Sequence, residues 1–350
     1  MARSLSIKGR GAAHNPPNRF DTQNRIAEAS EGAGPSPPTQ LIRERARSII
    51  TYNDSPDIGF DASINVYRGC EQGCIYCYAR PTHEYLGYSA GLDFETKIIV
   101  KENAPALLRK ALSDTKWQPT VLAMSGVTDP YQPVEKQLRL TRQCLEILLE
   151  FRNPVAIVTK NSGVTRDIDL LSQLARFDTA AVFISITTLD PKLHQKLEPR
   201  ASRPEKRLEA LERLSQAGIP TGVMAAPVIP GLNDSEIPQI LIAAARAGAA
   251  FAGMTPLRLP HAVAPIFEDW LTRHFPDRKS KVLNHVREMR EGQLNDARFF
   301  SRMKGSGLYA KQIRELFALS RRKAGMPQIM PRLSTDHFKS VHPKQLSLFS

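Results

Sequence analysis

From about residue 60 onward, short runs of apolar and β-branched residues alternate with amphipathic stretches. Short apolar runs bounded by turn residues are typical of buried strands. We predict strands at 63–67, 121–125, 155–159, 181–187, 221–228 and 251–257. Between the strands, apolar side chains recur every three or four residues, which is the period of an α-helix. We predict helices over 137–151, 204–217, 235–247 and 311–323.

Strands that alternate with helices form parallel sheets, because each helix returns the chain over one face of the sheet by a right-handed crossover. About six such units favour a TIM-like barrel, full or partial, over an open doubly wound sheet. The predicted fold class is therefore α/β, with a partial (β/α)6 TIM-like barrel. In such barrels the functional groups gather at the carboxyl ends of the strands.

The two ends of the chain differ from the middle in composition and charge. Residues 1–40 are rich in Pro, Gly, Ser and Asn, so we expect an N-terminal arm over 1–55 that is largely disordered. The core is expected over 56–275, and a basic, partly helical extension over 276–350. The net charge is +13, and residues 271–350 hold 17 Lys and Arg against 6 Asp and Glu. Basic ends indicate a polyanionic partner such as nucleic acid, although a general solubility bias gives the same pattern.

The composition also bears on the cellular compartment. The first residues lack the apolar segment of a secretory signal, and the most apolar helical stretch, 241–253, is too short to span a bilayer. Three of the four cysteines lie within eight positions, which suits metal binding better than a disulfide framework. We therefore expect a cytoplasmic protein that does not associate with membranes.

The three clustered cysteines are Cys70, Cys74 and Cys77. Their spacing lets one tight loop direct three thiolates at a single iron–sulfur cluster, and three ligands for four irons leave one iron open for catalysis. Two alternatives remain. A structural zinc site could take His83 as its fourth ligand. An electron-transfer cluster could take Cys144, although that residue lies on an apolar helical face typical of core.

The pattern Cys-x3-Cys-x-Tyr-Cys, after the first strand of a predicted β/α barrel, resembles the signature of the radical S-adenosylmethionine (SAM) superfamily. The resemblance covers about residues 60–260 and implies two cofactors, a [4Fe–4S] cluster and SAM. In that superfamily the open iron binds SAM, and reductive cleavage of SAM gives a radical that abstracts hydrogen. It also implies an electron donor, such as flavodoxin or ferredoxin.

The same resemblance implies a set of SAM-binding residues. The turn after the second strand would hold the amino group, although it departs from the usual Gly-Gly-Glu and Asp129-Pro130 also fits ordinary turn chemistry. Lys160 or Arg200 would neutralise the carboxylate, and hydroxyls of the fourth strand would bind ribose. A surface lysine and a strand Ser/Thr pair are also common without any such role. The full predicted set is Ser125, Gly126, Thr128, Asp129, Lys160, Ser185, Thr187 and Arg200.

Within the superfamily, the flanking of Cys77 by Tyr76 and Tyr78 is similar to the spore photoproduct lyase branch, a group of DNA repair enzymes. There a tyrosine pair relays hydrogen, which makes Tyr76 and Tyr78 catalytic candidates here. Alternatively, Tyr76 simply packs near adenine. The chain departs from the lyase pattern, which includes a hydrogen-donating cysteine. The one remaining thiol here, Cys144, lies on an apolar helical face typical of a core residue.

The C-terminal tail holds a last motif, formed by Gln345, Leu346, Leu348 and Phe349. It resembles the short peptide by which bacterial polymerases and repair proteins bind the DNA sliding clamp, although a frayed terminus or a tail packed on the barrel is the alternative.

The leading hypothesis is a radical SAM enzyme that acts on nucleic acid in DNA repair or modification. The alternatives are radical chemistry on a protein, a tRNA or a small molecule, and a non-catalytic iron–sulfur or zinc adaptor that binds DNA.

Overall fold

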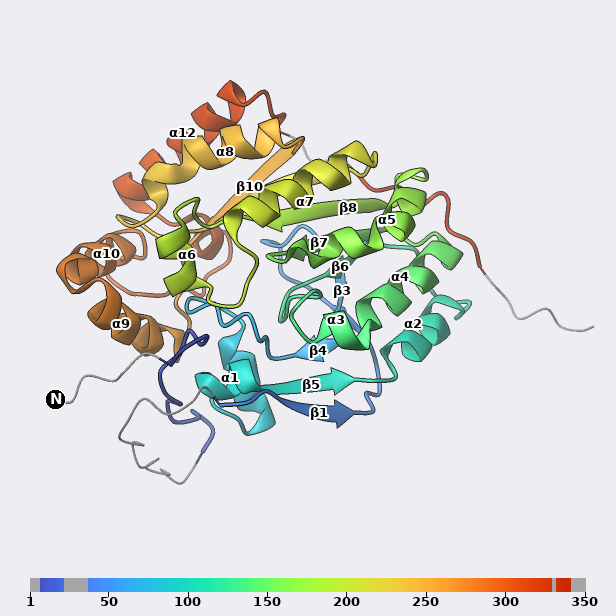
Figure 1. Ribbon diagram of the computed structural model, residues 1–350, viewed down its shortest axis with the longest axis horizontal. Coiled ribbons are helices and arrows are strands. Elements are labelled where there is room, and N and C mark those ends of the chain that lie inside the picture. The colour runs from blue at the N-terminus through green and yellow to red at the C-terminus, as the bar shows by residue number, and fades with distance from the viewer. Residues whose placement is uncertain (1–6, 22–36, 329–331, 341–350) are drawn as a thin grey trace, which may run out of the picture.

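The computed structural model describes residues 7–21, 37–328 and 332–340. Its centre is a seven-stranded sheet in the order β10-β9-β8-β7-β6-β3-β2, in which the first six strands are parallel and β2 is antiparallel to β3 (Figure 1). The strands are β2 (Ile50–Tyr52), β3 (Ala62–Ile64), β6 (Leu122–Met124), β7 (Val155–Thr159), β8 (Ala180–Ser185), β9 (Thr221–Val228) and β10 (Phe251–Pro256). The predicted α/β fold with six parallel strands is confirmed, and the sheet curves as a partial barrel.

Helices cover the outer face of this sheet (Figure 1). They are α2 (Ala104–Leu112), α3 (Glu135–Leu138), α4 (Leu140–Phe151), α5 (Ile168–Ala175), α6 (Pro191–Leu197), α7 (Pro204–Gln216) and α8 (Ile237–Arg246), with short 3-10 turns η2 (Ser162–Asp167) and η3 (Asp234–Glu236). The predicted helix over 137–151 is interrupted at Arg139, whose φ of 54° is left-handed and therefore ends α3.

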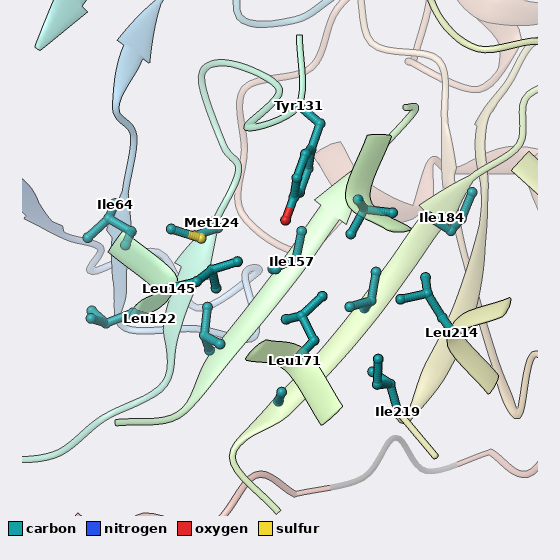
Figure 2. Close-up of a cluster of buried hydrophobic side chains, with 14 of the residues drawn as sticks. Ile64, Leu122, Met124, Tyr131, Leu145, Ile157, Leu171, Ile184, Leu214 and Ile219 are labelled. Atoms are coloured by element: carbon teal, nitrogen blue, oxygen red, sulfur yellow. The ribbon is translucent and has the colours of Figure 1, made fainter. Parts of the chain in front are cut away.

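The core lies between the sheet and these helices (Figure 2). Ile64, Met124 and Ile157 occupy one row across β3, β6 and β7, because each is in register with the next. Leu145 of α4 and Leu171 of α5 close the layer from the helix side. Each fully buried aliphatic side chain contributes about 1.5–3 kcal/mol to the free energy of folding. This packing holds the strands in place, and with them the strand ends that carry the site.

A second, three-stranded sheet has the order β1-β5-β4, with β1 (Gln40–Glu44), β4 (Tyr67–Arg68) and β5 (Lys97–Lys101). The sequence analysis does not predict it. The expected disordered arm over 1–55 also differs from the structure, because residues 7–21 and 37–55 are described and pack on the core. Ala12, for example, is buried beside Cys74 and Ile75. The arm is held mainly by hydrogen bonds, which cannot be predicted from its amino-acid composition.

Past β10 the chain is helical, with α9 (Val263–His274), α10 (Pro276–Glu288), α11 (Ser301–Lys304) and α12 (Gly307–Lys323). One hydrophobic cluster joins Phe267 and Trp270 of α9 to Leu283 of α10 and to Leu197 of the core. Helix α12 packs along α8. Of the helices that the structure describes, none combines the length and apolarity needed to cross a bilayer.

Candidate active site

The cysteine loop, residues 69–79, lies between β4 and the 3-10 helix η1 (Arg80–Leu86), near the carboxyl end of β3. Cys70 and Cys74 are buried and Cys77 is partly exposed. Gly69 and Gly73 turn the loop with φ of 78° and 67°, a conformation that glycine adopts without a steric penalty. A Cβ atom on Gly69 would also lie 2.9 Å from the His83 ring.

The loop gives the three thiols a common electrostatic environment. Burial raises the pKa of all three thiols. After burial, the nearby Glu198 carboxylate is the largest influence that raises the pKa of Cys74. Backbone N–H groups of Gln72 and Asp129 face the Cys70 sulfur and oppose the effect of burial on its pKa. Buried thiols, with backbone N–H donors at Cys70 and Cys77, fit a shared cationic cluster, which would favour their thiolate forms.

The structure gives no support to the alternative ligands. As the side chains stand, no group of three or more His, Cys, Asp or Glu in the described part of the chain, the three clustered cysteines included, is arranged to hold a metal ion, so the cluster assignment rests on the cysteine spacing and the family rather than on side-chain geometry. His83 lies behind the loop, where its Nε2 is 2.9 Å from the Lys97 carbonyl oxygen. Burial lowers the pKa of His83 to about 4. Cys144 lies on the buried face of α4 and is part of the hydrophobic core.

Two of the predicted SAM-binding residues contact the cysteine loop. Thr128 donates a hydrogen bond of 2.7 Å to the Gly69 carbonyl. Arg200 forms an ion pair of 3.2 Å with Glu71, the residue after Cys70. Gln132, which the sequence analysis missed, accepts the Glu71 N–H at 3.0 Å. These contacts fix the loop from the turn after β6 and from the turn after α6.

The turn after β6 also contains the predicted residues Ser125, Gly126 and Asp129. Asp129 accepts hydrogen bonds from the Thr159 hydroxyl at 2.7 Å and from the Lys160 N–H at 2.8 Å, so it joins this turn to the end of β7. Gly126 has φ of 124°, and a Cβ atom there would meet no heavy atom closer than 3.9 Å. A small side chain at Gly126 would therefore reach no closer than ordinary contact with Asn65.

Lys160, Ser185 and Thr187 meet at the ends of β7 and β8. The Lys160 ammonium donates to the Ser185 hydroxyl at 2.6 Å and to the Thr187 hydroxyl at 3.1 Å. It also donates to the Ala226 carbonyl of β9 at 3.0 Å. Ser185 and Thr187 share one face because side chains alternate along extended backbone.

Beneath this group lies Glu198, a residue that sequence analysis did not single out. Its carboxylate is fully buried and accepts hydrogen bonds from Thr187 at 2.6 Å and from Tyr76 and Arg207, and Lys160 lies 3.3 Å away. Burial opposes ionisation, but Arg207, Lys160 and His194 outweigh it and lower the pKa of Glu198. The only signal in the sequence is the charged turn that runs from Glu198 to Arg200.

The two candidate tyrosines have different surroundings. Tyr76 is buried, and its hydroxyl contacts Glu198 and Thr187. Tyr78 is 52% exposed and donates a hydrogen bond of 2.7 Å to the Gly126 carbonyl. The tail motif from Gln345 to Phe349 lies outside the described residues, so clamp binding stays a prediction.

Comparison with known proteins identifies the class. The model of the radical SAM superfamily matches residues 64–243, about half of the chain. The chain belongs to this superfamily. Membership of this superfamily implies a radical SAM enzyme with a [4Fe–4S] cluster and SAM as cofactors.

Particular relatives add detail. An uncharacterized protein of Mycobacterium tuberculosis is 36% identical to this chain over 224 residues. The match covers 63% of this chain and 66% of the relative, so the chain spans slightly less than two thirds of the relative's length. A radical SAM Nα-GlyT isomerase of Pseudomonas phage M6 is 25% identical over 71% of this chain and 50% of its own. The solved structure of spore photoproduct lyase complexed with dinucleoside spore photoproduct superposes with a TM-score of 0.57 and 17% identity, over 81% of this chain and 79% of that chain. The likeness to the lyase shows a common fold.

Proposed function

We propose that this radical SAM enzyme acts on nucleic acid, in DNA repair or modification. In this proposal Cys70, Cys74 and Cys77 bind the [4Fe–4S] cluster. When bound, the cluster and SAM supply reductive cleavage of SAM and the radical that abstracts hydrogen. Lys160 offers its charge to the SAM carboxylate, and the Ser185 and Thr187 hydroxyls offer hydrogen bonds to ribose. Tyr76 and Tyr78 remain the candidates for hydrogen relay.

The observation that carries the choice of nucleic acid is a set of three exposed rings with two partly buried arginines beside them, which we call the aromatic rim (Tyr78, Arg258, Phe299, Phe300 and Arg302). Tyr78 directly follows Cys77, and the Arg258 guanidinium lies 5.9 Å from the centre of its ring. The Arg302 guanidinium lies 4.7 Å from the Phe299 ring. Phe299 and Phe300 are 52% and 62% exposed.

Exposed aromatic rings interleaved with arginine suit nucleic acid, because bases stack on the rings while cations contact phosphate. Arg258 joins the two parts of the aromatic rim, because it lies over the ring of Tyr78 in the cysteine loop and also donates to the Met303 sulfur of α11 at 3.4 Å. Residues 271–350, which include Phe299 and Phe300, also carry most of the net positive charge. The ligand named for the solved lyase complex is a dinucleoside, which supports the same class of substrate.

Binding of labelled single-stranded and duplex DNA, measured by fluorescence anisotropy across a salt series, tests the proposal. Wild-type protein should bind DNA with an affinity that falls as salt rises. The double variant Phe299→Leu/Phe300→Leu keeps apolar bulk but removes the rings, and it should lose roughly tenfold in affinity or more. Tyr85→Leu, at an exposed tyrosine outside the aromatic rim, is the matched control and should bind like wild type. Absence of DNA association by wild-type protein at low salt would instead favour a protein or small-molecule substrate.

A further inference from the structure

A segment of the N-terminal arm lies against the cysteine loop, although it stands outside the match to the superfamily, which begins at residue 64. We call residues 10–19 the strap. It is part of the dark blue segment beside α1 (Leu92–Thr96) in Figure 1. Ala12 of the strap shares a buried hydrophobic cluster with Cys74 and Ile75 of the loop.

The strap and the loop meet through two glycines. A Cβ atom on Gly11 would lie 1.9 Å from the carbonyl oxygen of Gly73, a distance that no pair of unbonded atoms tolerates. Gly73 stands directly before Cys74, and its own Cβ would lie 2.8 Å from Glu95. Only residues without side chains fit at this contact, so the backbones of strap and loop pack directly on each other.

A buried ion pair connects the strap to a cluster ligand. Glu95 accepts the backbone N–H groups of Gly11 at 3.0 Å and Ala12 at 2.9 Å. The same carboxylate pairs with Arg80 at 2.5 Å, and both side chains are fully buried. Arg80 in turn donates two hydrogen bonds to the Cys74 carbonyl, at 2.9 and 3.1 Å. The strap therefore supplies two of the donors that satisfy this carboxylate.

A second connection reaches the other end of the loop. Arg10 donates to the Glu95 carbonyl at 2.8 Å and to the Thr39 hydroxyl at 3.3 Å. Thr39 donates to Glu71, next to Cys70, at 2.9 Å. Through Arg10 and Gly11 the strap thus bears on the residues beside two of the three cysteines.

The far end of the strap is anchored away from the cysteines. The Asn18 side-chain amide donates to the carbonyls of Glu84 at 2.9 Å and Tyr88 at 3.2 Å. Asn18 itself is buried. A substitution at Asn18 therefore weakens the attachment of the strap without changing any residue that contacts the cysteine loop.

We infer that the strap is a positioning element of the cysteine loop, so that retention of the cluster depends on a segment outside the superfamily domain. The inference rests on the proposed assignment of Cys70, Cys74 and Cys77 as cluster ligands. With the strap docked, Arg80 and Glu95 are fully paired and hold Cys74. With the strap displaced, the Glu95 carboxylate loses two backbone donors in a buried site, and the loop loses its packing partner.

The experiment compares full-length wild type with two variants and a control. Gly11→Val disrupts the strap at the loop, and Asn18→Ala loosens it at the far anchor. Gly59→Ala is the control, because a Cβ atom there meets no heavy atom within 4 Å.

Hydrogen exchange on metal-free protein should show the backbone amides of 69–79 exchanging roughly tenfold faster or more in both variants, the factor expected when buried hydrogen bonds are lost. Amides of β7 to β9 should keep their protection. Unchanged exchange at 69–79 would overturn the inference, and so would global loss of protection in Asn18→Ala.

Iron retention provides the second readout. After anaerobic reconstitution, both variants should release iron to a chelator several-fold faster than wild type and Gly59→Ala. Equal release rates, together with faster exchange at 69–79, would overturn the role in cluster retention. Failure of wild type to take up a cluster would instead count against the cysteine assignment, and the exchange result would still decide whether the strap positions the loop.

Discussion

The buried carboxylate of Glu198 offers the sharpest prediction for stability. Replacing it with glutamine keeps the shape of the side chain and removes its charge, which leaves Arg207 and Lys160 facing a neutral group. Removing one partner of a buried ion pair costs about 3–5 kcal/mol. Arg207 keeps two other acceptors, the carbonyls of Ser202 and Ser185, each at 2.7 Å. We therefore expect Glu198→Gln to lower the free energy of unfolding by about 3 kcal/mol, the lower end of that range.

Denaturant unfolding of metal-free protein under anaerobic conditions measures this loss. Glu209→Gln is the matched control, because Glu209 forms an exposed ion pair with Lys206. Surface pairs contribute about 0–1 kcal/mol, so the control should stay close to wild type. If Glu198→Gln is as stable as Glu209→Gln, the account of the buried network is wrong.

The same variant has a predicted pH signature. The pKa of Glu198 is lower in the folded protein than its ordinary value of 4.5, because Arg207 and Lys160 outweigh the effect of burial. The charged form therefore stabilises the fold above that ordinary value, and the contribution declines as the pH falls below it. Wild type should lose its advantage over Glu198→Gln as the pH is lowered below about 4.5. A difference that grows on acidification would contradict the assigned charge state.

Three further predictions concern single residues or the tail. Cys144→Ala should retain iron and form 5′-deoxyadenosine from SAM at the wild-type rate, while costing about 1 kcal/mol of stability, because Cys144 is a core residue. Loss of 5′-deoxyadenosine formation in a folded variant would contradict a purely structural role for Cys144. Lys160→Met should weaken SAM binding roughly tenfold in equilibrium dialysis, and Lys160→Arg should restore part of it; unchanged binding would remove Lys160 from the site. The double variant Leu348→Ala/Phe349→Ala should lose binding to purified sliding clamp in surface plasmon resonance, and equal binding by both proteins would dispose of the motif.

The strands of the core could be predicted because their side chains carry the signal. Buried parallel strands are apolar on both faces, so the runs at 155–159 and 221–228 match β7 and β9 in both bounds. The break between α3 and α4 could not be predicted, because Arg139 is a good helix former whose left-handed conformation is set by its surroundings. In the small sheet, β1 is largely exposed and β4 has only two residues, so neither carries a clear hydrophobic signal. The buried Ile98–Val100 run of β5 does carry the signal of a strand and should have been predicted.

The site shows the same division. The spacing of the cysteines is visible in the sequence, and the alternation of Ser185 and Thr187 follows from strand geometry. The strap could not be predicted, because its anchors are backbone groups and buried polar side chains such as Asn18 and Arg10, which composition counts as typical of disorder. Glu198 gains its importance from Arg207 and Lys160, which lie beside it only in the folded chain.

The account depends most on three cysteines that hold a [4Fe–4S] cluster with one iron open to SAM. Electron paramagnetic resonance of the dithionite-reduced, anaerobically reconstituted protein, recorded before and after addition of SAM, tests this directly. We predict a cluster signal that changes when SAM is added, about four irons per chain, and loss of the signal in Cys74→Ala but not in Cys144→Ala. A reconstituted protein that carries zinc, or a cluster whose spectrum is the same with and without SAM, would contradict it.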